Sequence, residues 1–306
     1  LKELMANELS VDHIKAFKWK MINSKSTYNV LHAVLSVVFS WSIRTKLFSG
    51  INPFLSIQKY KIPKIKTKLP DDKRDAIKEH CSSKAFDYNP QFLTLVAITL
   101  YTGCRGSEFY GLRWEQPKTE DEKKKCSGWL EPDWENLKEK RYIYLWDTKN
   151  RKPFRVFIRE PLKKLFIRLR KKLYEDPKYS WCLRSPYLFP KTRYNDNFPD
   201  EHTDRNTVAY PLMDLNRKFG LIVQNSSGND VGLFHMRMGR KTFGSQVAKE
   251  QGVEVASRAL NHSSPTVTRE HYICPDDEDL EFELNEPSSN VESIEHHRIE
   301  KKNKLK

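Results

Sequence analysis

The residues best suited to chemistry in this sequence gather between Phe234 and Tyr272, in the segment FHMRMGRKTFGSQVAKEQGVEVASRALNHSSPTVTREHY. This segment holds a basic run, a histidine followed by two serines, and a tyrosine ten residues beyond that histidine. Two earlier segments, TGCRGSE at 102–108 and DTKNRKP at 147–153, contribute arginine and lysine. Arginines, a lysine, a histidine and a tyrosine are together the groups needed to attack a phosphodiester with a tyrosine hydroxyl.

The distribution of charge indicates what kind of partner the chain binds. The 306 residues carry a net charge of +14 and have a pI of about 9.4. Residues 1–275 carry 49 basic and 30 acidic side chains, a net charge of +19, whereas residues 276–287 carry seven acids and no base. A body this basic favours a polyanionic partner, with nucleic acid as the first candidate and a solvated basic surface as the alternative.

Two classes of protein are disfavoured by composition. No run of 18 or more apolar residues occurs, so the sequence predicts no membrane span. The number of cysteines is odd and none forms a CxxC pair, which disfavours a disulfide framework or a zinc site and favours a reducing cytosol. The cysteines are Cys81, Cys104, Cys126, Cys182 and Cys274.

The elements that must position these residues can be predicted from apolar spacing. Residues 10–47 predict two helices; Ser10 can cap the first, and an apolar stripe from Leu31 to Trp41 marks the second. Residues 55–70 hold five lysines and two prolines without helical spacing, which predicts an extended basic linker. The run 91–101 is apolar on most faces, as in a buried helix.

Further along, Tyr142–Trp146 and Phe154–Ile158 read as the two strands of a β-hairpin. A helix is predicted to begin at Pro161, and short helices are predicted over 240–250, 253–260 and 265–272. The charged segment 116–140 is predicted to be a surface insertion.

At this point the sequence resembles the tyrosine recombinases of the phage-integrase type. The first box of that family, T-G-x-R-x-x-E-x-x-x-L-x-W, stands here as TGCRGSEFYGLRW, and its hairpin lysine box as TKNRKPFRVFI. The second box, commonly H-x-L-R-[HR]-T-F-x-S, stands as RMGRKTFGS, and the closing box as LNHSSPTVTREHY. Four boxes in the family's order make the resemblance specific. The segment before Pro53 is similar to the end of the family's helical core-binding domain.

The resemblance implies a mainly α fold with a small antiparallel β-sheet or hairpin, arranged as a two-domain C-shaped clamp. Residues 1–58 are expected to form a helical core-DNA-binding domain, either whole or only its last part, and residues 59–70 a basic linker. Residues 71–275 are expected to form the catalytic domain. Residues 276–306 are expected to form a charged C-terminal tail, either disordered or docked onto a neighbouring subunit.

The resemblance also assigns roles in a strand-cleavage reaction. Tyr272 is the expected nucleophile, and its attack would leave a 3′-phosphotyrosine. Arg105 and Arg240 are expected to clamp the non-bridging phosphate oxygens, because a guanidinium presents two parallel donors to a phosphate. His262 is expected to be a third donor to the same oxygens, or to assist with the proton of the tyrosine.

The remaining assignments concern the hairpin and the second box. Lys149 is expected to protonate the departing 5′ oxygen, with Lys152 in the same turn as the competing candidate. Glu108 is expected to brace the neighbouring arginine. Arg237 occupies the place of the usual second-box histidine, and both a phosphate donor and a structural basic residue are open there.

The function implied is that of a site-specific DNA recombinase, an integrase of a mobile element that requires no metal, ATP or other cofactor. Its expected partners are double-stranded DNA at a recombination site and three further copies of itself, in a tetramer on two duplexes, with no membrane partner. Whether DNA-bending accessory proteins take part is open. Its expected location is the cytoplasm, at the nucleoid, or the host-cell compartment that holds the DNA. The alternatives are a type IB topoisomerase-like enzyme and a DNA-binding relative that no longer cleaves.

Overall fold

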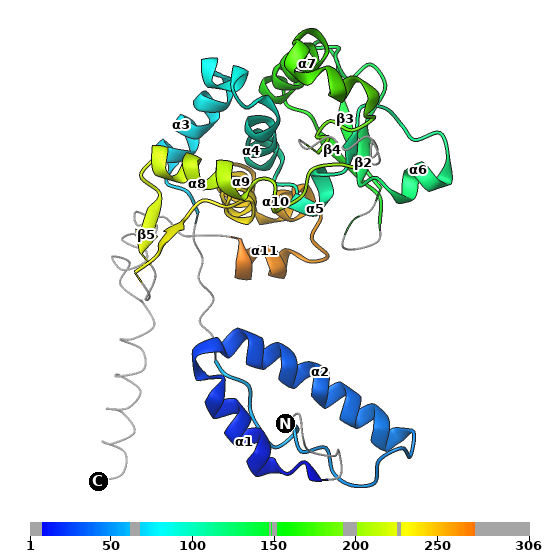
Figure 1. Cartoon of the computed structure of the whole chain (residues 1–306), viewed down its shortest axis with the longest axis vertical. Coiled ribbons are helices and arrows are strands. Elements are labelled where there is room, and N and C mark those ends of the chain that lie inside the picture. The colour runs from blue at the N-terminus through cyan, green and yellow to red at the C-terminus, as the bar shows by residue number, and fades with distance from the viewer. Residues whose placement is uncertain are drawn as a thin grey trace, which may run out of the picture. The chain divides into compact units, whose positions relative to one another are not determined.

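A computed structural model describes residues 8–61, 68–146, 148, 152–191, 201–224 and 228–272 (Figure 1). The chain divides into two compact units, residues 1–65 and residues 66–306. In the described part of the chain, no helix combines the length and the apolar character that a membrane crossing requires.

The first unit is built on two helices, as the sequence predicts. Helix α1 spans Val11–Lys20 and helix α2 spans Lys25–Arg44, and a short 3₁₀ turn, η2 (Ile22–Ser24), joins them. Ser10 caps α1, because its side chain accepts a hydrogen bond from the backbone N–H of His13.

The buried face of α2 is not the apolar stripe that the sequence marks. Val34 and Trp41 of that stripe are 54% and 48% exposed, whereas Tyr28 and His32 are buried. The buried face contacts the segment 52–60, which begins with a turn: His32 Nε2 lies 2.8 Å from the carbonyl oxygen of Ile57. Hydrogen bonds to backbone groups therefore act together with the buried ring of Phe54, which packs against His32 and Phe39, to cover this face of α2.

The second unit is organised around helix α4 (Pro90–Thr102), which is buried along almost its whole length. Helices α3 (Asp71–Ser82), α7 (Glu160–Glu175) and α9 (Met236–Gln251) pack around it (Figure 1). Asn89 caps α4 by accepting from the N–H of Phe92, and Gly103 ends it in the left-handed conformation at φ +66°. The predicted buried helix is thus confirmed, with both of its ends set by local sequence.

A four-stranded sheet lies beside these helices, with strand order β1-β2-β3-β4. Strands β3 and β4 form the predicted hairpin, in a register that pairs Ile143 with Val156. The β1–β2 pair is parallel, so the sheet is mixed rather than purely antiparallel. The strands are β1 (Leu112–Arg113), β2 (Gly128–Leu130), β3 (Tyr142–Leu145) and β4 (Phe154–Phe157).

The prediction of a surface insertion over 116–140 is wrong in part. The segment does contain a short exposed helix, α6 (Glu120–Lys124), but it also supplies β2, which is buried and sits between β1 and β3. Trp129, Leu130 and Trp134 are all buried. Burial of these three apolar side chains stabilises β2 between β1 and β3. The charged residues around them mask the strand pattern in the sequence.

The remaining elements complete the described part of the second unit. Helix α9 begins at Met236, four residues before the predicted start, because His235 acts as its N-cap. A second hairpin, β5–β6, has no counterpart among the sequence predictions. The other elements are η3 (Lys84–Asp87), α5 (Gly106–Phe109), η4 (Pro177–Arg184), α8 (Ala209–Lys218), β5 (Ile222–Gln224), β6 (Asp230–Gly232), α10 (Val253–Ala259) and α11 (Pro265–His271).

Gly103 should tolerate a side chain poorly for two separate reasons, a close approach of neighbours and a positive φ. A Cβ there would lie 2.4 Å from Phe243 Cδ1 and 2.9 Å from Leu260 Cδ2, and the residue has a positive φ. Gly220 has a similar φ of +64° with no atom within 4 Å of its Cβ position, so it is a matched control. Gly220→Ala should cost about 1–2 kcal/mol of unfolding free energy from backbone strain alone. Gly103→Ala should cost about 1–3 kcal/mol more from overpacking.

Urea unfolding of the two variants measures the difference directly. Equal losses of unfolding free energy would show that Phe243 and Leu260 move aside, and that the close approach of α9 and α10 to the end of α4 is not a constraint.

Candidate active site

Arg240 lies at the centre of the candidate site and is only 3% exposed. Its Nη1 donates to the carbonyl oxygen of Gly103 at 2.6 Å, and its Nη2 donates to that of Leu260 at 2.5 Å. Its Nε donates to the hydroxyl of Tyr272 at 3.3 Å, and its Nη2 also lies 3.1 Å from Nε2 of His262. One side chain therefore joins the end of α4, the turn after α10 and the residue after α11.

Local sequence features bring α9 into position for this arginine. The side chain of His235 accepts from the N–H of Met238 and so fixes the first turn of the helix. Gly239 lets α9 approach α4 closely, since a Cβ there would lie 2.3 Å from Thr99 Cγ2. Arg240 follows directly and enters the space beside Gly103.

Arg105 reaches the same place through the carboxylate of Glu108. The guanidinium of Arg105 donates to Oε1 of Glu108 at 2.7 Å, and its backbone N–H donates to Oε2 at 2.7 Å. Oε2 also lies 3.9 Å from Nη1 of Arg240. Glu108 is buried between the two guanidiniums, so its charge offsets theirs and holds both in place. The side chain of Arg105 is 22% exposed, which leaves it accessible to a ligand.

His262 is held from both ring nitrogens. Nε2 faces Arg240, and Nδ1 lies 2.8 Å from the hydroxyl oxygen of Thr268. The pKa of His262 is lowered to about 4, chiefly by burial and then by the charges of Arg240, Arg105 and His271. The imidazole is therefore neutral near pH 7.

Tyr272 is positioned by a small apolar cluster separate from the main core. Phe243, Val247, Ala256 and Leu260 form this cluster, and the tyrosine ring packs against it. The ring of Tyr272 lies 4.4 Å from that of His262, centroid to centroid. Its backbone is fixed as well, because Ser245 Oγ donates to its carbonyl oxygen at 2.5 Å. The hydroxyl is thus presented to Arg240 by helices α9, α10 and α11.

Arg237 does not join this cluster. It lies exposed on the first turn of α9, and among the described residues no hydrogen bond or ion pair links it to Arg240, His262 or Tyr272. Its positive charge acts on His235. The pKa of His235 is lowered chiefly by burial, and then by the charges of Lys241, Arg237 and Arg205. The residue in the place of the usual second-box histidine therefore faces solvent beside other cations.

One of the two candidate lysines of the hairpin turn, Lys149, lies outside the described residues. Lys152 is described and exposed, and its carbonyl oxygen accepts from the hydroxyl of Thr148 at 2.8 Å.

Sequence reasoning missed several groups that complete the site. These are the carbonyls of Gly103 and Leu260, the hydroxyl of Ser245 and the hydroxyl of Thr268. Ser245 had a signal, because it closes the second box. Thr268 had only the weak signal of a small polar residue within a short predicted helix, and the contact it makes depends on the tertiary fold.

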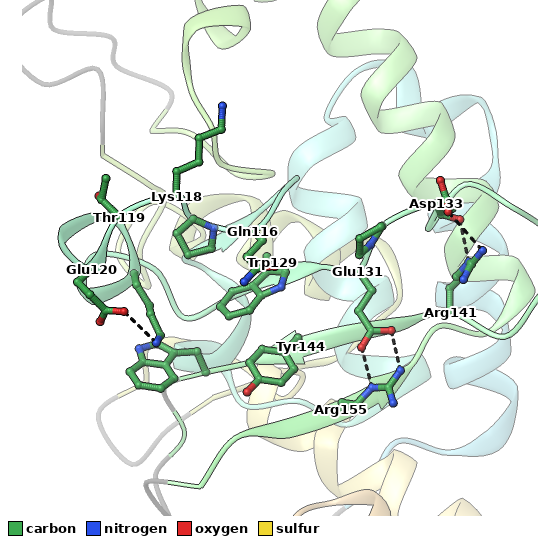
Figure 2. A pocket seen from close by; sticks show the side chains of 14 residues that line it. Gln116, Lys118, Thr119, Glu120, Trp129, Glu131, Asp133, Arg141, Tyr144 and Arg155 are labelled. Atoms are coloured by element: carbon green, nitrogen blue, oxygen red, sulfur yellow. Dashed lines mark hydrogen bonds and ion pairs between the residues drawn. The ribbon is translucent and has the colours of Figure 1, made fainter.

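A separate pocket of about 840 Å³ lies on the outer face of the four-stranded sheet (Figure 2). Its floor holds the rings of Trp129 and Tyr144, 4.5 Å apart between centroids. Three of its cations are already paired with acids, which leaves them poorly placed to take a phosphate. The pairs are Arg155 with Glu131, Arg141 with Asp133, and Lys123 with Glu120.

Comparison with known proteins connects this geometry to a fold. No protein-family model matches the sequence, and no curated protein matches it. Solved structures do match. A structure of lambda integrase residues 75–356, a dimer bound to a COC′ core site, has a TM-score of 0.62 and 14% identity, covering 89% of this chain and 82% of that one.

Two further structures match over most of the chain. XerH site-specific recombinase, in a post-cleavage complex with a palindromic difH substrate, has a TM-score of 0.64 and 16% identity, covering 93% of this chain and 73% of that one. The Tn1549 transposon integrase, in complex with a circular intermediate DNA, has a TM-score of 0.59 and 16% identity, covering 92% and 87%. The chain has the fold of the two-domain tyrosine recombinases, so the resemblance predicted from the sequence is confirmed at the level of fold.

The low pKa of His262 predicts how the free energy of unfolding changes with pH. Between pH 6.5 and about 4, the unfolded chain binds a proton on this histidine that the folded chain excludes. Folding stability should therefore fall as the pH falls through this window. His262→Gln lacks this titrating group, so its unfolding free energy should fall less steeply as the pH falls over the same range.

Urea unfolding at a series of pH values measures the two slopes. The readout is the slope and not the absolute stability, since the substitution also removes the contacts with Arg240 and Thr268. Parallel slopes for the two proteins would mean that His262 binds its proton as readily in the folded state as in the unfolded state.

Proposed function

We propose that this protein is a site-specific DNA recombinase that cleaves and rejoins DNA through a 3′-phosphotyrosine on Tyr272. The observation that carries the proposal is the contact between the Tyr272 hydroxyl and the buried guanidinium of Arg240, with Arg105 joined to the same cluster through Glu108. Phosphate chemistry needs a nucleophile beside donors that can hold the non-bridging oxygens. DNA as the partner is supported by the similar structures, which are DNA complexes.

In the proposed reaction, the Tyr272 hydroxyl loses its proton to water as its oxygen attacks the scissile phosphorus, and the bond to the 5′ oxygen breaks. The 5′ oxygen leaves with a proton from the lysine of the hairpin turn, for which Lys149 is our first candidate and Lys152 the second. The products are a phosphotyrosine diester and a free 5′ hydroxyl. Attack by a 5′ hydroxyl of another strand reverses the same step and restores the tyrosine.

The contacts of Arg240 indicate what a bound phosphate must displace. Nε and Nη2 of Arg240 donate to Tyr272 and contact His262. A phosphate oxygen that takes these donors releases the tyrosine oxygen from the guanidinium while keeping it close to phosphorus. Meanwhile the bonds from Arg240 to the carbonyls of Gly103 and Leu260 can remain, so the clamp needs no large rearrangement.

The wider assembly follows from the same proposal. We propose residues 1–58 as the core-DNA-binding domain, 59–70 as the linker and 71–275 as the catalytic domain, acting as a tetramer on two duplexes in the compartment that holds the DNA. Binding should weaken with salt, by a log–log slope near 0.9 for each phosphate neutralised. The proposed trans-docking tail, 276–306, lies outside the described residues.

The first test captures the covalent intermediate from a mixed pool of DNA sequences. Nicked duplexes with randomised flanks, in which the fragment carrying the 5′ hydroxyl diffuses away after cleavage, are incubated with the protein and run on a denaturing gel. The wild type should form protein–DNA adducts whose recovered sequences converge on one site. Tyr272→Phe should form none, because it lacks the attacking oxygen. Arg105→Lys should cleave about 10²–10³-fold more slowly.

Tyr210→Phe is the matched control, since Tyr210 is 85% exposed and should keep full activity. Wild-type protein that binds duplex in a salt-sensitive manner yet never forms an adduct would establish a DNA-binding relative that does not cleave. Adducts accompanied by relaxation of supercoiled DNA, without strand exchange between two duplexes, would establish a topoisomerase-like enzyme.

A second test identifies the lysine that protonates the leaving oxygen. Lys149→Met should lower the rate of cleavage by about 10²–10⁴-fold on ordinary DNA. The same variant should cleave nearly normally when sulfur replaces the bridging 5′ oxygen, because a thiolate leaves without a proton. Lys152→Met, with the same loss of charge, should be close to wild type on both substrates.

If the sulfur substrate restores cleavage by Lys152→Met and not by Lys149→Met, then Lys152 is the residue that protonates the leaving oxygen. A defect in Lys149→Met that persists on the sulfur substrate would show that this lysine binds DNA and does not transfer a proton.

A further inference from the structure

The two hydrogen bonds of His262 fix which of its nitrogens carries the proton. A guanidinium nitrogen can only donate, so Nε2, 3.1 Å from Nη2 of Arg240, must be the acceptor. The neutral ring then carries its proton on Nδ1, which donates to the hydroxyl oxygen of Thr268 at 2.8 Å. With Arg240 and Thr268 as its partners, His262 is therefore the Nδ1–H tautomer.

The proposed function, on which this inference rests, requires the opposite arrangement. Non-bridging phosphate oxygens only accept hydrogen bonds, so His262 can contribute to the clamp only with a proton on Nε2. A second proton on the ring is disfavoured, because the ring is partly buried beside the cations of Arg240 and Arg105, and the carboxylate of Glu108 offsets their charges only in part. A change of tautomer supplies the Nε2 proton without adding charge.

Thr268 is suited to permit this change. Its hydroxyl can accept from Nδ1–H in one tautomer and donate to a bare Nδ1 in the other, whereas a carboxylate or a carbonyl could only accept. The residue is fully buried on α11, and its carbonyl oxygen accepts from the backbone N–H of Tyr272 at 2.9 Å. The same turn of chain therefore fixes the hydroxyl and the attacking tyrosine.

We propose that Thr268 is a positioning residue whose hydroxyl lets His262 exchange tautomers when a DNA phosphate replaces the imidazole on Arg240. On exchange, one proton leaves Nδ1 to water and one is taken up at Nε2 from water, so the charge of the ring does not change. The hydroxyl of Thr268 rotates from acceptor to donor, and Nε2–H is then free to donate to the phosphate.

The resting tautomer can be tested without any activity. Long-range ¹H–¹⁵N correlation spectra of the protein with ¹⁵N-labelled histidine should show His262 protonated at Nδ1 and bare at Nε2 near pH 7. Thr268→Val keeps the shape of the side chain and removes the hydroxyl, so its Nδ1 proton should exchange with water at least ~10-fold faster. Thr268→Ser should resemble the wild type. A wild-type ring protonated at Nε2 would overturn the proposal.

The change of tautomer is tested on the duplex recovered from the capture experiment. Added to Tyr272→Phe protein, this duplex should move the His262 proton to Nε2. On nicked substrate, Thr268→Val should cleave about 10–100-fold more slowly than the wild type, as expected for loss of a residue that orients a functional histidine. Its affinity for the duplex should be unchanged, and Thr268→Ser should cleave within about threefold of the wild type.

The negative results that these experiments can give distinguish failure of the role of Thr268 from failure of the proposed function. Adducts formed equally well by wild type and Thr268→Val, or a His262 ring that keeps its Nδ1 proton on DNA, would overturn the role of Thr268 and leave the proposed function standing. Equal losses of cleavage and of duplex affinity in Thr268→Val would indicate a structural role only. No adduct from the wild type on any duplex would overturn the proposed function and the tautomer change together, with the resting tautomer still decided by the spectra.

Discussion

The candidate site in the second unit depends on the burial of one guanidinium. A charged group taken out of water must have its donors satisfied and its charge balanced, and Arg240 meets both demands with groups from distant parts of the chain. Two backbone carbonyls, at Gly103 and Leu260, fix the ends of α4 and α10 against α9. The carboxylate of Glu108 supplies the nearby negative charge. The positions of His262 and Tyr272 follow from the helices that this arginine joins.

The same interaction accounts for how the site can be both stable and ready for a ligand. The contacts of Arg240 with main-chain carbonyls hold the guanidinium in place, whereas its contacts with Tyr272 and His262 are longer and can be exchanged for an anion. A preorganised cation beside a nucleophile is the arrangement that stabilises charge developing on a phosphate. Because His262 is neutral near pH 7, it adds no positive charge beside Arg240 and Arg105.

Sequence patterns predicted the features that are set locally. The apolar run 91–101 specified the buried helix α4, and the two strand-like runs 142–146 and 154–158 specified the β3–β4 hairpin. The order of the four boxes also identified Arg105, Glu108, Arg240, His262 and Tyr272, which the structure brings together.

Features that depend on tertiary contacts were not predictable in this way. Strand β2 is three residues long and lies in a charged segment, so only its pairing on both sides reveals it. The buried face of α2 is covered by the segment 52–60, through hydrogen bonds from Asn29 and His32 and through ring packing of Phe54 on His32, and it is not the apolar stripe. The partner of His262, Thr268, becomes visible only when α11 is folded against it.

The measurement that tests the central claim most directly is a structure of Tyr272→Phe protein bound to the duplex recovered by covalent capture or, if no duplex is captured, to the duplex it binds most tightly. We predict the scissile phosphate within hydrogen-bond distance of both Arg105 and Arg240, with the position-272 ring turned toward phosphorus and His262 facing the phosphate in place of the guanidinium. A duplex that binds with no phosphate in this cluster, while Arg240 still contacts His262 as in the structure without DNA, would contradict this claim.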